Sequence, residues 1–332
     1  MKIFFTIIAA LLLLNSCNTA TKGNAILEKS LITLGGEKQY VEISGTSDTK
    51  PVLLFLHGGP GWPQTPFLRY FNKDITKAFI LVSWDQRGSG LSYVNNPNPA
   101  NMTLQQIVND AHELTNYLKN KFNQRKIYIA GYSWGSIVGM QLAIQFPEDY
   151  EAYISISQII NLKKGMAVSQ QWLKDQATKD KDTATLNSLQ QINDTTFYKS
   201  DLDCYMQQYK LLNKYKGGIY NDSIIEKEEK IMKLYDDYKD YNWNKAFEFS
   251  ASHLAKDMFA TDFTKVERLN IPVYFLVGQH DWNVPAVITA MFEENLIAPD
   301  KKLYWFKNSG HNLLEEEAAA FNETIRFKII NE

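Results

Sequence analysis

A glycine-flanked serine between a buried strand and a helix is the feature that most constrains this chain. Residues 127–130 (Ile-Tyr-Ile-Ala) form a short apolar run of strand-forming side chains, and the sequence GYSWG follows at 131–135. The apolar content of residues 137–146 then predicts a buried helix. A strand, a G-x-S-x-G turn and a helix together lift a serine hydroxyl to the end of a sheet, where the strained backbone needs glycine. We therefore predict a nucleophilic Ser133; the alternative is a serine in an ordinary strand-to-helix turn.

The composition fits a folded protein with no affinity for polyanions. The 332 residues are 45% hydrophobic and 22% charged, which allows a sizeable buried core. The formal net charge is −2 at pH 7, so no strong positive field would gather nucleic acid or an anionic membrane. We therefore expect no nucleic-acid partner.

The N-terminus has the pattern of a secretory signal. A methionine and a lysine precede an apolar run over residues 3–14 that only Thr6 interrupts. The run is too short to span a bilayer but is typical of the core of a signal peptide. It ends in Leu-Asn-Ser-Cys at residues 14–17, which resembles the bacterial lipobox. This resemblance implies that Cys17 is acylated and becomes the first residue of the mature chain.

These features predict an exported, lipid-anchored protein. The signal peptide would cover residues 1–16, the lipid would be attached to Cys17, and the small, polar residues 17–25 would form a flexible tether. Acyl chains alone would hold the protein on the periplasmic or cell-surface side of a bacterial membrane. Plain secretion with cleavage nearby is the alternative. Cys204 is the only other cysteine, so an acylated chain has no intramolecular disulfide available.

Short apolar runs alternate with helical patterns along most of the remaining chain. A helix is predicted after Thr103, which would cap it, with Gln106 completing a capping box. Apolar residues at helical spacing continue to Phe122. This alternation implies an α/β fold with a mainly parallel sheet wound on both faces. The predicted strands are residues 26–34 and 37–44, which form a hairpin around Gly35-Gly36, and then 52–56, 79–84, 127–130, 153–160, 271–278 and 302–306.

Residues 161–258 have a different residue pattern from the rest of the chain. Buried-strand runs disappear, and Lys, Asp, Gln and Tyr alternate with spaced apolar residues. We interpret this stretch as a helical cap inserted into a core made of residues 26–160 and 259–332. Its aromatic side chains either form the core of a small domain or line a substrate pocket. They include Trp172, Tyr205, Tyr209, Tyr215, Tyr235, Tyr238, Trp243 and Phe247.

Three residues that follow predicted strands carry the groups of a nucleophilic hydrolase. A serine hydroxyl is a poor nucleophile, so it needs a base within hydrogen-bond reach and a third group that orients the base. Ser133, Asp281 and His311 all lie just after strands, and the carboxyl ends of parallel strands meet at one end of a sheet. We therefore predict that these three side chains form one hydrogen-bonded Ser-His-Asp chain.

The remaining histidines fit structural roles better. The five histidines are scattered without an i,i+4 pair, and the two cysteines are not paired in the sequence, so we expect no metal site. No nucleotide-binding glycine loop is present, and we expect no cofactor. The histidines assigned to structural roles are His57, which would shape the glycine-rich loop after its strand, and His112, His253 and His280.

Three segments together resemble the hallmark segments of the proline iminopeptidase family, which belongs to the α/β-hydrolase superfamily. They are HGGPG at residues 57–61, WDQRGSG at 84–90 and GYSWGS at 131–136. The resemblance covers nearly the whole mature chain and implies an α/β-hydrolase fold with a helical cap. In the second segment, Asp85 and Arg87 are predicted to brace the loops through hydrogen bonds.

The resemblance also implies a role for each site residue. Ser133 would be the nucleophile, Asp281 the acid and His311 the base, in the Ser-Asp-His chain order of α/β hydrolases. The backbone N–H groups of Gly59 and Trp134 would form the oxyanion hole. The implied activity is release of N-terminal residues from short peptides, with proline favoured. The alternatives are an ester, lactone or amide hydrolase with the same triad, and a ligand-binding protein without turnover.

Acidic residues of the cap are candidates for holding the free α-amine of a peptide substrate. Proline iminopeptidases use acidic side chains in or near the cap for this purpose, and the resemblance extends that expectation to this chain. A charged run such as residues 226–230 is equally typical of a solvated helix face. The candidates are Glu226, Glu228, Glu229 and Glu248.

Overall fold

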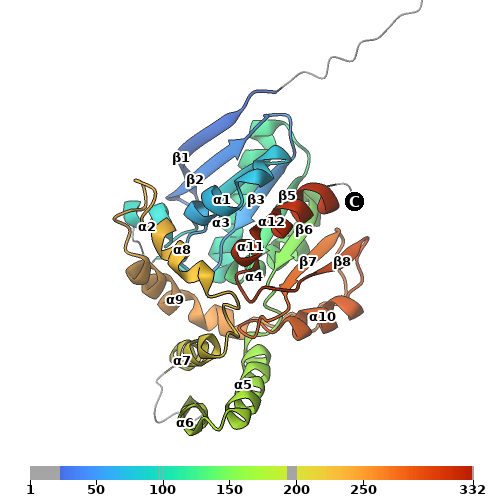
Figure 1. The fold of residues 1–332 in the computed structure, drawn as a ribbon. Coiled ribbons are helices and arrows are strands. Elements are labelled where there is room, and N and C mark those ends of the chain that lie inside the picture. Colours follow the sequence, from blue (N-terminus) through green and yellow to red (C-terminus); the bar gives the residue numbers. More distant parts are fainter. Residues whose placement is uncertain (1–22, 97, 99, 193–199, 331–332) are drawn as a thin grey trace, which may run out of the picture.

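The computed structural model describes residues 23–96, 98, 100–192 and 200–330. The predicted signal peptide, Cys17 and most of the predicted tether lie outside the described residues. An eight-stranded sheet runs through the molecule in the order β1-β2-β4-β3-β5-β6-β7-β8, and only β2 runs opposite to the other strands (Figure 1). The strands are β1 Ile26–Leu34, β2 Glu37–Gly45, β3 Val52–Leu56, β4 Ile80–Trp84, β5 Ile127–Tyr132, β6 Tyr150–Ile156, β7 Val273–Gly278 and β8 Lys301–Phe306. The mainly parallel α/β-hydrolase sheet predicted from the sequence is thereby confirmed.

The strand residues alternate between two hydrophobic cores, one on each face of the sheet. In β3, Val52, Leu54 and Leu56 enter one core, while Leu53 and Phe55 enter the other. Both faces of this strand are buried, which explains its unbroken apolar sequence. The first core is covered by α3 (Leu104–Phe122), α4 (Trp134–Gln145) and α10 (Ala286–Asn295). The second is covered by α1 (Thr65–Phe71), α11 (Leu313–Glu316) and α12 (Ala318–Glu323) (Figure 1).

The insertion between β6 and β7 is helical. It contains α5 (Leu162–Lys179), α6 (Thr183–Ile192), α7 (Asp201–Lys214), α8 (Ser223–Ile231) and α9 (Trp243–Ala260). A single β-bridge between Asn161 and Asp262 joins the two ends of the insertion. Helices α5, α6 and α7 form a projecting lobe, whereas α8 and α9 lie against the body of the molecule (Figure 1). None of the helices in the described ranges is long and apolar enough to cross a bilayer.

The shorter elements complete the chain. Helix α2 spans Gly90–Asn95, and the single turns η1 and η2 span Lys73–Lys77 and Pro147–Asp149. A π-helical turn, η3, spans Thr324–Ile329 after α12.

Buried and partly buried polar contacts hold the cap against the sheet domain. Arg69 of α1 donates to Glu42 of β2 at 2.9 Å and to Asp237 of the cap at 2.8 Å. The Tyr238 hydroxyl donates to Asp85, whose carboxylate also accepts hydrogen bonds from core residues. Burial raises the pKa of Asp85 to about 6, so this carboxylate depends on its donors. The predicted bracing role of Asp85 is confirmed.

Arg87, the other predicted brace, is also buried and hydrogen-bonded. Its Nε donates to Asp110 at 2.9 Å and its Nη2 donates to the Gly35 carbonyl at 3.1 Å. It therefore ties the loop after β4 to α3 and to the β1–β2 hairpin, as the sequence predicts.

Two local predictions are wrong. β6 ends at Ile156 rather than at residue 160, because its ladder with β5 is complete there and Ser157 turns into the left-handed region with φ +48°. Thr103 does cap α3 by accepting from the Gln106 N–H at 3.2 Å. The Gln106 side chain, however, donates to Asp110 at 2.8 Å instead of closing a capping box, because that carboxylate lies one turn further along the helix.

Candidate active site

Ser133 occupies a strained position between β5 and α4. Its φ and ψ angles are +51° and −118°, a conformation that side chains rarely adopt. A Cβ atom on Gly131 would lie 2.5 Å from the Gly135 carbonyl oxygen, and one on Gly135 would lie 2.1 Å from the Leu56 carbonyl oxygen. The two glycines therefore allow β5, α4 and the end of β3 to approach closely around the serine.

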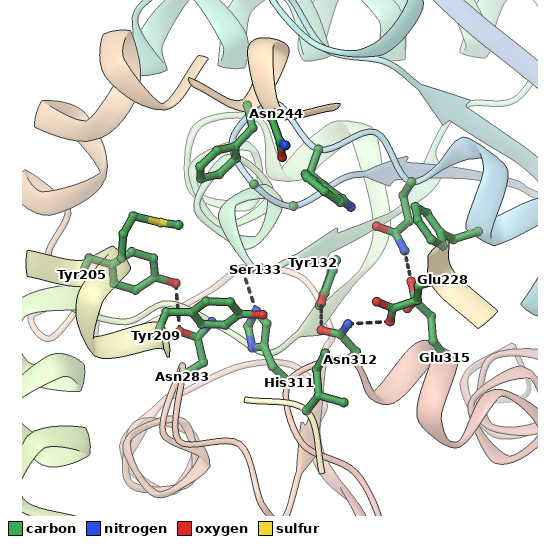
Figure 2. Close-up of a pocket in the computed structure, with 18 residues that line it drawn as sticks. Tyr132, Ser133, Tyr205, Tyr209, Glu228, Asn244, Asn283, His311, Asn312 and Glu315 are labelled. Atoms are coloured by element: carbon green, nitrogen blue, oxygen red, sulfur yellow. Dashed lines mark hydrogen bonds between the residues drawn. The ribbon is translucent and has the colours of Figure 1, made fainter. Parts of the chain in front are cut away.

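The structure brings Ser133, His311 and Asp281 into one hydrogen-bonded chain. His311 follows β8 and Asp281 follows β7, so both lie at the carboxyl ends of their strands. The distance from Ser133 Oγ to His311 Nε2 is 2.9 Å, and that from His311 Nδ1 to Asp281 Oδ2 is also 2.9 Å (Figure 2). All three residues are less than 10% exposed. Their geometry is that of a nucleophile, a base and an orienting acid.

The second oxygen of Asp281 is held by the backbone. Asp281 Oδ1 accepts hydrogen bonds from the N–H groups of Asn283 at 2.9 Å and Val284 at 2.8 Å. Oδ2 is thereby left for His311. An ionised carboxylate can only accept, so His311 Nδ1 carries the proton and Nε2 faces Ser133 as an acceptor.

Two free backbone N–H groups lie beside Ser133. Within the described residues, neither the Gly59 nor the Trp134 N–H donates a hydrogen bond. Trp134 begins α4, and the first N–H groups of a helix have no partner within it. Gly59 has φ +110°, which favours glycine, and it lines the same cavity as Ser133. These are the donors that the resemblance assigns to an oxyanion hole.

Gln86, which sequence reasoning did not single out, joins the segments that carry these two N–H groups. Its side chain donates to the His57 carbonyl at 3.0 Å and accepts from Trp134 Nε1 at 3.0 Å. Its backbone N–H donates to His57 Nε2 at 3.1 Å. Burial lowers the pKa of His57 to about 4, so this imidazole is neutral and can accept that hydrogen bond. His57 therefore shapes the glycine-rich loop, as predicted.

The hydrogen-bonded chain faces a cavity of about 290 Å³ between the sheet domain and the cap. Figure 2 shows Glu228 and Glu315 together at one end of it, and Tyr205, Tyr209 and Asn283 at the other. Ser133 and His311 lie between the two ends. The aromatic residues of the insertion thus divide between two roles. Some line this cavity, and others, such as Trp172, Tyr238 and Trp243, pack in hydrophobic clusters that also include residues of the sheet domain.

At the acidic end of the cavity, one carboxylate of the cap lies near one carboxylate of the sheet domain. Glu228 of α8 accepts from Asn312 Nδ2 at 2.9 Å, and the Tyr132 hydroxyl donates to Asn312 at 2.9 Å. Glu315 of α11 accepts from Gln64 Nε2. Burial, and then the negative charge of Glu228, raise the pKa of Glu315 well above its usual value.

Of the four acidic candidates in the cap, the structure brings Glu228 alone to this cavity. Glu226 pairs with Lys230 at 2.6 Å on the exposed face of α8, and Glu229 and Glu248 are also exposed. Glu315 was missed, because acidic residues at the start of a helix also suit its dipole. Its position only four residues after His311 was the available signal.

The remaining histidines have local partners. His112 Nε2 lies 2.9 Å from an Asp149 oxygen, His253 Nδ1 lies 2.7 Å from the Phe249 carbonyl, and the His280 ring stacks on Tyr220. In the part of the chain that the structure describes, no cluster of three His, Cys, Asp or Glu residues could hold a metal ion.

A mainly parallel, doubly wound sheet with a serine on the turn after its central strand defines an α/β hydrolase. The family model described as alpha/beta hydrolase fold matches residues 51–318. The chain therefore belongs to the α/β-hydrolase family.

Relatives in that family confirm the resemblance to proline iminopeptidases. A Bacillus subtilis protein named "Probable aminopeptidase YbaC" is 30% identical over 309 residues, covering 92% of this chain and 96% of its own. The proline iminopeptidase of Neisseria gonorrhoeae is 37% identical over 110 residues, about 33% of each chain. The crystal structure of a proline iminopeptidase-related protein from Thermus thermophilus superposes with a TM-score of 0.66 at 19% identity, covering 92% of this chain and 98% of that one.

Proposed function

We propose that this protein is a serine hydrolase that releases N-terminal residues from short peptides by acyl transfer. The observation that carries the proposal is the chain Ser133–His311–Asp281 facing a cavity with two carboxylates at one end. The aminopeptidase name of the full-length relative supports the same activity.

The geometry suggests how each group acts. His311 Nε2 takes the proton from Ser133 Oγ as the oxygen attacks the scissile carbonyl, and Asp281 stabilises the resulting imidazolium. The N–H groups of Gly59 and Trp134 stabilise the developing oxyanion; one such donor is typically worth about 10²–10³ in rate. His311 then gives its proton to the leaving amine, and water releases the acyl group by the reverse sequence.

Glu228 and Glu315 supply the recognition of a free α-amine. An ammonium group between two carboxylates forms charge-assisted hydrogen bonds, which are stronger than neutral ones. The aromatic rings of Trp62, Phe67 and Phe247 line the same cavity and suit an apolar N-terminal side chain, including the ring of proline.

An ester, lactone or amide hydrolase with the same triad is the second candidate, and one observation favours it. The acidic residues already have protein partners in Asn312 and Gln64, and the raised pKa of Glu315 lets it hold a proton. With a proton on Glu315, the acidic end of the cavity carries less negative charge and can accept a neutral acyl group. Paired assays on prolyl arylamides, their N-acetyl derivatives and short acyl esters separate the candidates. The proposal requires a preference for the free amine and is contradicted by equal or better turnover of the acetylated substrate.

Glu228→Gln should lower kcat/KM for a prolyl arylamide by about 10–10²-fold, because a charged hydrogen bond contributes about 1.5–3 kcal/mol. Activity on a neutral ester should change less than about twofold, since the triad is untouched. Steady-state kinetics on both substrates measures the difference. Glu229→Gln, one residue along α8 and exposed, is the matched control.

The same pair predicts a pH dependence. The raised pKa of Glu315 means that it gains a proton as the pH falls, whereas a bound ammonium favours its ionised form. KM for the free amine should therefore fall as pH rises, until the amine itself loses its proton near about pH 8. KM for the neutral ester should not follow this trend. If Glu228→Gln lowers kcat/KM for the prolyl arylamide and for the neutral ester to the same extent, that result argues against an amine subsite.

We also propose that the protein is exported and anchored through Cys17, as the N-terminal pattern indicates. Cys17→Ser should abolish incorporation of a labelled fatty acid in a bacterial host and release the activity from the membrane fraction. A mature N-terminus at another residue in the unsubstituted protein would contradict lipidation.

A further inference from the structure

A segment of the cap crosses the loops that carry Asp281 and His311. This segment, residues 217–221, connects α7 to α8, and we call it the strap. The Gly217 carbonyl accepts from the N–H of Trp282, next to Asp281, at 2.7 Å. The Gly218 carbonyl accepts from the N–H of His311 itself at 2.7 Å. Successive carbonyls of the strap thus bind the loop of the acid and the loop of the base.

The strap makes close contacts with both loops. A Cβ atom on Gly310 would lie 2.2 Å from the Gly218 carbonyl oxygen, so the loop before His311 touches the strap directly. The Tyr220 ring stacks on His280, with centroids 3.7 Å apart and planes within 4°. The His280 N–H in turn donates to the Ser309 carbonyl at 2.9 Å. A shift of the strap would therefore move both loops.

One carboxylate locks the strap to the loop of His311. Glu316 Oε2 accepts from the N–H groups of Tyr220 at 3.0 Å and Asn221 at 2.7 Å, while its Oε1 accepts from the Gly310 N–H at 3.0 Å. Three backbone donors from two segments converge on a single side chain. Without this side chain, donors in both segments would be unpaired, and the two segments would lose their common acceptor.

We propose that Glu316 is a positioning residue: through the strap it holds the base His311 in line with Ser133, so that the cap sets the geometry of the triad as well as the shape of the cavity. This inference rests on the proposed catalytic role of the triad. Such positioning has a large effect because a displacement of about 1 Å at a reacting group can cost about 10²-fold in rate.

Glu316→Gln tests the proposal, with a neutral short-chain ester as substrate so that amine recognition does not enter. The amide keeps the size of the side chain, but its nitrogen cannot accept from an N–H, so at least one segment is released. We expect kcat to fall by about 10–10²-fold, KM to stay within about threefold, and the acidic limb of the kcat–pH profile to shift. Glu316→Asp, which keeps the carboxylate, should recover part of kcat. Glu323→Gln, exposed on α12, is the control.

Several outcomes would overturn the positioning role. Unchanged kcat and pH profile in a folded Glu316→Gln protein would do so, as would a change confined to KM. If the glutamine variant does not fold, Glu316→Asp decides: a lower kcat at unchanged KM supports the proposal, and wild-type kcat contradicts it. Ser133→Ala distinguishes a failure of the positioning role from a failure of the proposed catalytic triad. An inactive Ser133→Ala beside a fully active Glu316→Gln removes only the positioning role, whereas an active Ser133→Ala removes the proposed function.

Discussion

Ser133→Ala is expected to lower turnover of both arylamide and ester substrates by at least about 10⁴-fold. The hydroxyl lies 2.9 Å from His311 Nε2 and projects from a strained turn beside two free N–H groups. Alanine leaves the base and the oxyanion donors in place but removes the atom that forms the acyl-enzyme. Because triad members act as a unit, the residual rate should be that of the remaining donors and of substrate binding alone.

The measurement for Ser133→Ala is kcat on both substrates, with thermal unfolding as a check on the fold. Ser252→Ala, at an exposed position on α9, is the matched control and should retain wild-type activity. A loss of less than about 10²-fold would mean that another residue supplies the nucleophile.

Asp281→Asn is expected to lower kcat by about 10⁴-fold while leaving the fold intact. Asp281 Oδ1 accepts from two backbone N–H groups, which only the oxygen of an amide can replace. The new NH₂ group must therefore face His311 Nδ1, which becomes the acceptor. The ring proton then moves to Nε2, where it blocks proton transfer from Ser133.

The two backbone donors thus fix the orientation of the asparagine amide, so the expected effect of Asp281→Asn depends on a single hydrogen bond to His311. Steady-state kcat on the ester is the readout, and Asp236→Asn, on the solvent-exposed surface of the cap, is the control. Retention of more than about a tenth of kcat would show that His311 does not depend on this carboxylate for its tautomer.

The sheet and the three triad positions were predictable for the same physical reason. Parallel strands buried on both faces favour apolar side chains at every position, so β3 and β7 stand out as apolar runs and β4 as a run that only Ser83 interrupts. The residues that follow parallel strands meet at one end of the sheet, which places Ser133 after β5, Asp281 after β7 and His311 after β8 together. Strand ends were less predictable. β6 stops at Ile156, where its ladder with β5 is complete, although two further isoleucines follow at 159 and 160.

The roles of the acidic residues after His311 were not predictable from composition. Glu315, Glu316 and Glu317 are adjacent and identical, but neighbouring side chains on a helix point about 100° apart. Glu315 faces the cavity, Glu316 accepts from the strap, and Glu317 accepts from the Asn308 N–H and the Ser309 hydroxyl. The roles of Glu315 and Glu316 depend on where the cap lies, and contacts between residues far apart in the sequence determine that.

Contacts between the cap and the sheet domain were also not predictable from local sequence. Asp237 lies in a charged stretch typical of a solvated surface, yet it pairs with Arg69, which is 168 residues away in the sequence. Burial alone would raise the pKa of Asp237, but the hydrogen bonds from Arg69 and Lys29 lower it to about 2. A local pattern cannot distinguish such a partner from an exposed acid.

Covalent labelling with a fluorophosphonate, mapped by mass spectrometry of the digested protein, shows directly whether Ser133 is the nucleophile. A single adduct should form on Ser133, in step with the loss of activity, and no adduct should form in Ser133→Ala. An adduct on any other residue, or a wild-type protein that hydrolyses ester yet stays active and unlabelled, would contradict this role of Ser133.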